Sequence, residues 1–129
     1  MATLDDVRRI AAGLPGSEER ATTGGAAWFV RNKLYAWEAT PFPSTEAAAR
    51  AIIAAEPCAG LKVAGEDEQR ALRQGWPEVF LGQTSPWGEP KITFRLGPID
   101  LQLLEELVTD AWYLQAPKYL RREFDGDPG

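Results

Sequence analysis

Histidine is absent from this sequence of 129 residues, and cysteine occurs once, as Cys58. Without imidazole there is no Ser-His-Asp or Cys-His arrangement for nucleophilic catalysis and no histidine ligand for a metal ion. A single cysteine cannot close an intramolecular disulfide or build a zinc site of several thiolates, and this usage fits a reducing compartment. We therefore expect no metal and no cofactor, and we expect Cys58 to be a buried, inert thiol.

Long hydrophobic runs are also missing. The longest aliphatic stretch, residues 47–55, is short and contains Arg50, so it does not predict a membrane span. The acidic residues Asp5 and Asp6 stand near the N-terminus, where a signal peptide has basic residues followed by an apolar core. These features predict a soluble, cytoplasmic protein without membrane contacts, and we expect it to be a monomer.

Residue patterns typical of enzymes are absent as well. Gly60 and Gly65 have the spacing of the outer glycines of a phosphate-binding loop, but acidic residues follow them where lysine and serine or threonine are needed. Neighbouring acids such as Glu105 and Glu106 point about 100° apart on a helix, so they do not converge on one proton or ion. Carboxylates alone can act on sugars, which leaves a carboxylate-based enzyme as a third hypothesis. Without a placed pair of acids, we expect no catalysis.

The hydrophobic pattern predicts an α+β fold. Apolar residues at helical spacing predict helices over residues 4–14, 45–56, 66–74 and 101–116, with Thr3 and Asp100 as N-caps. β-prone residues predict strands over 26–32, 33–39, 61–63 and 91–96, with loops over 17–25 and 82–90. We expect one domain over residues 1–120, in which N- and C-terminal helices pack against a small antiparallel sheet, and a short polar tail over 121–129.

Three groups of basic residues are the candidates for binding an anionic ligand. Lys91, Thr93 and Arg95 alternate with apolar residues and are expected on the outward face of one strand. The other two groups flank the predicted turn at Asn32 and follow the last helix: Arg31 and Lys33, and Lys118, Arg121 and Arg122. The whole chain carries 14 basic and 19 acidic residues, a net charge of −5, which weakens non-specific attraction to DNA. Trp87, in a loop with few apolar neighbours, is the candidate anchor for a protein partner or a small ligand.

The sequence resembles the MmcQ/YjbR family of small bacterial proteins. The resemblance is carried by Leu14-Pro15-Gly16-Ser17-Glu18-Glu19, by Trp28-x-Val30-x-x-Lys33-x-Tyr35-Ala36, by Pro77-Glu78-Val79-Phe80 with the strand after it, and by Leu107-Val108-Thr109-Asp110-Ala111-Trp112-x-x-x-Ala116-Pro117-Lys118. These motifs cover residues 3–120 in the family's order. The resemblance implies a YjbR-like α+β fold, similar to that of secretion chaperones, and a DNA-binding role inferred for the family from a double-wing motif of hairpins.

Two main hypotheses about function follow from the resemblance and the residues. The first is a non-catalytic, DNA-binding protein that uses Arg31, Lys33, Lys91 and Arg95, with Lys118 as a further contact. In this hypothesis, Lys33 matches the hairpin lysine of the family and Lys118 the lysine that follows its closing helix. The second is a module that binds a protein partner or a small ligand around Trp87 and does not bind DNA.

Overall fold

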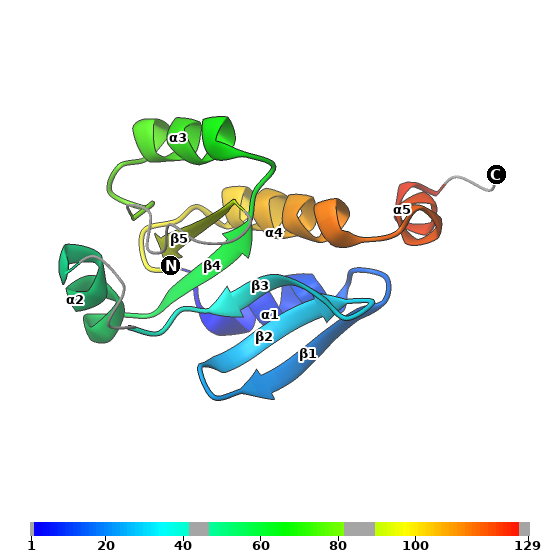
Figure 1. The fold of residues 1–129 in the computed structure, drawn as a ribbon, viewed down its shortest axis with the longest axis horizontal. Coiled ribbons are helices and arrows are strands. Elements are labelled where there is room, and N and C mark those ends of the chain that lie inside the picture. The colour runs from blue at the N-terminus through cyan, green and yellow to red at the C-terminus, as the bar shows by residue number, and fades with distance from the viewer. Residues whose placement is uncertain (1, 42–46, 82–89, 127–129) are drawn as a thin grey trace.

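The computed structural model describes residues 2–41, 47–81 and 90–126. Five strands form one antiparallel sheet in which each strand pairs with the next in the sequence, in the order β1-β2-β3-β4-β5 (Figure 1). The strands are listed here in chain order: β1 (Ser17–Thr22), β2 (Gly25–Val30), β3 (Lys33–Glu38), β4 (Cys58–Lys62) and β5 (Lys91–Arg95). The helices of the described residues are α1 (Leu4–Ala12), α2 (Ala47–Ala55), α3 (Glu66–Gly75), α4 (Leu101–Gln115) and α5 (Lys118–Asp125). The predicted α+β fold, with terminal helices on a small antiparallel sheet, is confirmed.

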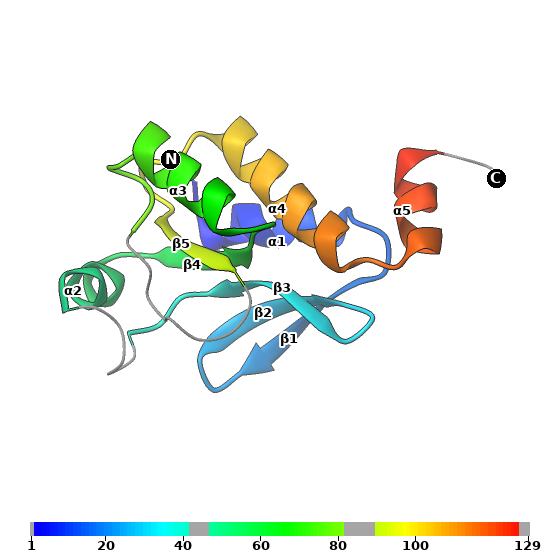
Figure 2. The same ribbon diagram turned by 45° about the horizontal axis from the view of Figure 1, so that its top comes forward.

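The main core lies between one face of the sheet and the helices α1 and α4 (Figure 2). Trp28 and Tyr35 from the sheet, and Val108 and Trp112 from α4, are buried there, each with at most 1 % of its surface exposed. The Tyr35 hydroxyl lies 2.5 Å from the Ser17 hydroxyl, so its polar end is satisfied inside the core. Burial of these large aromatic residues supplies much of the drive to fold.

Both predicted N-caps are confirmed. The Thr3 hydroxyl accepts a hydrogen bond from the Asp6 backbone N–H, and the Asp6 carboxylate accepts one from the Thr3 N–H, which together form a capping box. The Asp100 carboxylate accepts a hydrogen bond from the N–H of Leu103 at the start of α4. These local signals begin the two helices that cover the core.

The other face of the sheet is covered at one corner by α2. Ala49 and Ile53 of α2 pack against Cys58 and Leu81 in a second, smaller cluster. Phe80 forms a bridge with Phe94, so the segment before residue 82 lies along the outer edge of β5. In the described residues, no helix is long and apolar enough to cross a membrane.

Two predicted non-regular segments are regular in the structure. Residues 17–22, expected to be a loop, form the edge strand β1, whose residues pair with β2 from Ser17 opposite Val30 to Thr22 opposite Gly25. The expected polar tail after residue 120 continues α5 as far as Asp125, and the Phe124 ring packs 5.3 Å from the ring of Trp112. The strand predicted over 61–63 also begins earlier, at Cys58. The 82–90 loop lies outside the described residues except for Pro90.

Candidate nucleic-acid interface

The antiparallel order of the strands gathers basic residues at one end of the sheet. The β2–β3 turn lies at this end. The C-terminal end of β4 and the N-terminal end of β5 lie there too, because Ala36 pairs with Leu61 and Lys62 pairs with Lys91. We call this group the basic end; its members are Arg31, Lys33, Lys62, Lys91 and Lys118. The topology thus collects four of the five predicted nucleic-acid contacts and adds Lys62.

Lys62 and Lys91 are the central pair of the basic end. They face each other across β4 and β5, an arrangement in which like charges repel. Partial burial, and then the charge of Lys62, lower the pKa of Lys91 below its ordinary value. An anion bound at this position would reduce the repulsion between the two ammonium groups. A site that binds phosphate is expected to have this positive potential.

The helices bring Lys118 to the same end. The Gln115 side chain at the end of α4 donates a hydrogen bond of 3.0 Å to the Leu34 carbonyl in β3, and Lys118 opens the next helix. A groove of about 200 Å³ between the ends of β4 and α4 is lined by Lys62, Pro90 and Gln115, among others. In both ribbon views, α5 lies at the end of the molecule that carries the β2–β3 turn (Figures 1 and 2). Arg31, Lys33 and Lys118 are exposed to solvent.

Arg95 does not belong to this group, although it shares the outward face of β5 with Lys91 and Thr93, as predicted. Arg95 lies opposite Cys58, at the far end of β5. Its guanidinium donates to the Glu56 carboxylate at 2.6 Å and to the Glu78 carbonyl at 2.8 Å, and the bond to Glu56 raises the pKa of Arg95. Thr93, between the two, is buried with 4 % of its surface exposed. Arg95 therefore joins segments of the fold and is not a free charge for a ligand.

Several carboxylates gather on the helical side of the molecule. On the helical side, burial and then the neighbouring carboxylates of Glu68 and Glu106 raise the pKa of Asp110. The Glu68 carboxylate also accepts a hydrogen bond from the Ala64 N–H, just after β4. The excess of acidic residues over basic ones is thus compatible with a local positive surface at the sheet end.

The face of the sheet opposite α1 and α4 adds aromatic rings to the basic residues, and sequence reasoning missed this. We call it the outer face and define it by Arg20, Phe29, Trp37 and Lys62. In each strand, the residues next to these four point into the core or pair with residues that point into the core. The Arg20 guanidinium lies 4.5 Å from the centre of the Phe29 ring, and the Lys62 ammonium lies 5.9 Å from that of Trp37. Alternation along the strands was the available signal, but the register shift between Trp28 and Phe29 skips Tyr35. Tyr35 and Ala36 are therefore both buried, and the alternation of β3 is interrupted.

Large apolar side chains are also exposed on the last two helices. They are Leu101, Tyr113 and Leu114 of α4 and Tyr119 and Phe124 of α5. Tyr113 donates a hydrogen bond to the Asp125 carboxylate at 2.9 Å, which raises the pKa of Tyr113, and the Arg121 guanidinium lies 5.2 Å from its ring centre. Trp87, the predicted anchor for a partner, lies outside the described residues.

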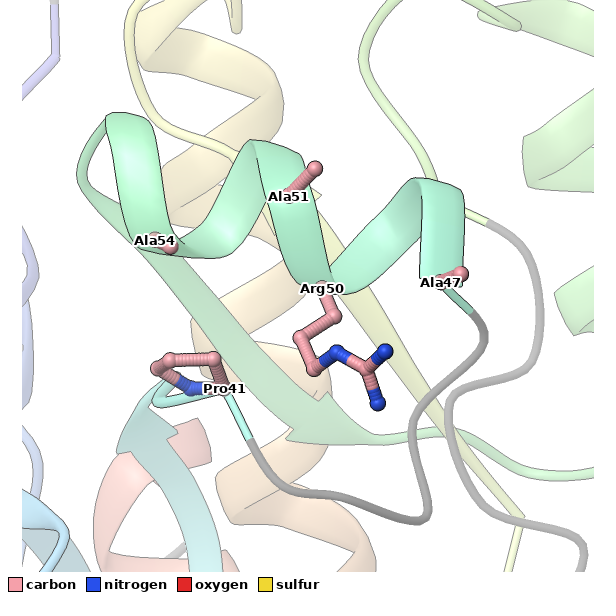
Figure 3. A pocket seen from close by; sticks show the side chains of 5 residues that line it. All are labelled: Pro41, Ala47, Arg50, Ala51 and Ala54. Atoms are coloured by element: carbon pink, nitrogen blue, oxygen red, sulfur yellow. The ribbon is translucent and has the colours of Figure 1, made fainter.

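The cleft beside α2 contains one charged side chain. Figure 3 shows a shallow groove in which Arg50 of α2 points into the space beside Pro41, among the small side chains Ala47, Ala51 and Ala54. In the described residues, no three acidic or cysteine side chains are grouped so that they could hold a metal ion. Cys58 is buried, as predicted, and this burial, followed by the charge of Glu56, raises its pKa to about 11.

Comparison with solved structures shows the fold of a known domain. The chain superimposes on Deinococcus radiodurans protein DR2400, a protein with a DUF419 domain, with a TM-score of 0.70 and 23 % identity. The match covers 97 % of this chain and 89 % of that protein, and the DUF419 fold is YjbR/MmcQ-like. At this identity, the likeness shows the fold alone.

Comparison with curated proteins shows the relatives of the chain. No family model matches it. It is 38 % identical, over the full length of both sequences, to the uncharacterized proteins Rv2570 of Mycobacterium tuberculosis H37Rv and Mb2600 of Mycobacterium bovis. The chain therefore belongs to the family of these uncharacterized mycobacterial proteins.

Proposed function

We propose that this protein is a non-catalytic nucleic-acid-binding protein of the MmcQ/YjbR type, which holds the phosphate backbone at the basic end. The observation that carries the proposal is the convergence of Arg31, Lys33, Lys62, Lys91 and Lys118 at one end of the sheet. The contacts come from a hairpin tip, from two strand ends and from a helix start, so the fold holds them in a fixed relation. The sequence resemblance and the DUF419 fold support the same family assignment.

Phosphate contacts make a quantitative prediction about salt. Each phosphate that a lysine or arginine neutralises adds about 0.9 to the slope of log affinity against log salt for duplex DNA, and about 0.7 for a single strand. If about four residues of the basic end make contacts, raising the salt from about 50 to 200 mM weakens duplex binding roughly 100-fold. Fluorescence anisotropy with labelled duplex and single-stranded DNA measures this directly.

Variants test whether the basic end is the contact surface. We expect Lys33→Gln with Lys118→Gln to weaken binding and to lower the salt slope by about 2, one per phosphate contact. Arg70→Gln is the matched control, because Arg70 is exposed on α3 and pairs with Asp67 within its own helix. Absence of binding at 50 mM salt, or equal losses from the control and the double variant, would refute the proposal.

A second candidate function is binding of a protein partner through α4 and α5. The exposed side chains of Tyr113, Leu114, Tyr119 and Phe124 favour it, since exposed large apolar side chains are typical of interfaces. In this case, Tyr119→Ser, which changes the most exposed of the four residues, abolishes binding of a purified partner protein, and Lys33→Gln leaves that binding unchanged. The reverse pattern would argue against this second function.

A further inference from the structure

We infer that the outer face binds single-stranded nucleic acid by stacking bases on Phe29 and Trp37. This inference rests on the proposed function and deepens it by naming the form of nucleic acid. Phe29 and Trp37 come from neighbouring strands, β2 and β3, and both rings are partly exposed. Exposed rings beside basic residues are the pattern by which proteins hold unpaired bases and their backbone together.

The register places the two rings diagonally on the same face. Trp37 pairs with Ala27, and Phe29 stands two residues further along β2. With strands about 4.8 Å apart and a rise of about 3.4 Å per residue, the positions of Phe29 and Trp37 are separated by roughly 8 Å. Two separate rings at this spacing present two stacking platforms on one surface.

Gly60 gives the Trp37 ring its place on the sheet. Gly60 pairs with Trp37 across β3 and β4, and a Cβ atom on Gly60 would overlap the indole. The missing side chain lets the ring lie against the backbone of β4. The backbone therefore supports the back of the indole, and the ring is held in place before any ligand arrives.

Each ring has its own cation, and the cations connect the outer face to the basic end. Arg20 lies over Phe29, forms an exposed ion pair with Glu18 at 2.9 Å and donates a hydrogen bond of 2.6 Å to the Asn32 side chain at the β2–β3 turn. Lys62 lies near Trp37 and belongs to the basic end through its pairing with Lys91. A backbone held at the basic end can continue along the outer face with its phosphates near Arg20 and Lys62.

The nature of the platforms favours unpaired bases over a duplex. In a duplex, each base face is already stacked on its neighbours, so a ring on a sheet gains nothing from it without unstacking the helix. A single strand offers its base faces freely, and stacking tolerates any sequence. In the described chain, α2 is the helix on this side of the sheet, and it packs at the opposite end, around Cys58 (Figure 2).

The test compares a labelled 12-nucleotide oligo-dT with a duplex of equal length by anisotropy at about 50 mM salt. We expect the single strand to bind at least 10-fold more tightly. Trp37→Leu and Phe29→Leu should each weaken single-strand binding by roughly 5- to 150-fold, the range for loss of one stacked base. Their salt slopes should stay unchanged, because no phosphate contact is removed.

Controls separate stacking from folding. Trp76→Leu removes an indole that is 41 % exposed after α3 and should leave binding unchanged. Trp37→Tyr keeps an aromatic ring and should retain most of the affinity that Trp37→Leu loses. Circular dichroism and thermal melting show which variants are folded. If Trp37→Leu does not fold, Phe29→Leu and Trp37→Tyr still decide the question.

The outcomes distinguish this inference from the proposed function. If neither nucleic acid binds, the proposed function fails. If the duplex binds as tightly as the single strand, and folded Phe29 and Trp37 variants bind like the unaltered protein, the inference is overturned. In that case the nucleic-acid-binding function stands, with the rings acting as packing for Arg20 and Lys62.

Discussion

Trp112 links distant parts of the chain through one side chain. Its indole is fully buried, and the indole N–H donates a hydrogen bond of 3.0 Å to the carbonyl of Pro15, in the turn after α1. The ring of Phe124 in α5 packs against it. One residue therefore holds α4, the α1–β1 turn and α5 together, and both its volume and its polar atom are used.

We expect Trp112→Ala to lower the free energy of unfolding by about 3–5 kcal/mol, because the cavity left by a buried indole cannot close completely. Urea unfolding followed by circular dichroism measures the loss. Trp112→Phe, which keeps an aromatic ring and loses the bond to Pro15, should cost less. A loss below about 1 kcal/mol for the alanine variant would contradict the burial described here.

At the scale of residues, burial could be predicted and partners could not. The apolar alternation of β5 correctly places Ile92, Phe94 and Leu96 in the core. The same alternation puts Lys91 and Arg95 on one face, but it carries no information about what packs on that face. Glu56, which holds Arg95, is 39 residues away in the sequence, so only the fold could show that Arg95 is already paired.

At the scale of elements, the β2–β3 turn is the most informative. Its two central residues, Arg31 and Asn32, have φ of +49° and +67°. Both values lie in the left-handed region that type I′ hairpin turns require, where asparagine and glycine are favoured. An arginine at the first position strains the hairpin backbone, and in the proposed function its charge contacts a phosphate.

We expect Arg31→Gly to separate stability from binding. The free energy of unfolding should stay unchanged or rise by up to about 1 kcal/mol, since glycine adopts positive φ without strain. Nucleic-acid affinity should fall, and the salt slope should decrease by about 1. Urea unfolding and anisotropy on the same preparation give both values. A clear loss of stability, or an unchanged affinity, would contradict the role assigned to Arg31.

The edge strand β1 and helix α5 show why two elements could not be predicted. β1 has the sequence Ser-Glu-Glu-Arg-Ala-Thr and is exposed along most of its length, so it has no apolar alternation. It is held by its pairing with β2 and by Glu19, whose carboxylate accepts hydrogen bonds from the Arg8 side chain and from the indole of Trp28. α5 is short and largely polar, and its contacts with α4 come from Phe124, Asp125 and Arg121.

At the scale of the whole molecule, alkaline pH acts on two buried groups. Burial raises the pKa of Cys58 from 9.0 to about 11 and that of Tyr35 from 10.0 to about 12, although the hydroxyl of Ser17 partly offsets the second shift. Between pH 9 and 12 the folded protein keeps protons that the unfolded chain has released. The unfolded state then binds fewer protons, so the free energy of unfolding decreases as the pH rises.

We expect the free energy of unfolding to fall between about pH 9 and 12, by up to about 1.4 kcal/mol per pH unit for each group. The lowered pKa of Lys91 opposes this trend with a single group. Urea unfolding at several pH values from 8 to 11.5 measures the slope. Cys58→Ala should flatten its lower part and Tyr35→Phe its upper part. A free energy that is constant or increasing from pH 9 to 11 would contradict these assignments.

The general architecture was accessible from the sequence because each strand pairs with its sequence neighbour. Local signals therefore predicted most of the sheet, through the hairpin around Asn32 and the alternation in β5. The caps at Thr3 and Asp100 predicted where two helices begin. The basic end depends instead on register, which brings Lys62 opposite Lys91, and on the return of α4 to β3 through Gln115. Such distant relations have no signature in a single sequence.

The bond between Trp112 and Pro15 joins residues 97 positions apart, and α4 also packs on α1 and on β3. During translation, the five strands can therefore complete their hydrogen bonds while α4, one of the two helices that cover the core, is still inside the ribosome. Until α4 emerges, the side chains of Trp28 and Tyr35 face water or whatever chaperone meets the nascent chain. The last long helix thus decides when synthesis yields a folded protein, and a premature stop before it would release an aggregation-prone sheet.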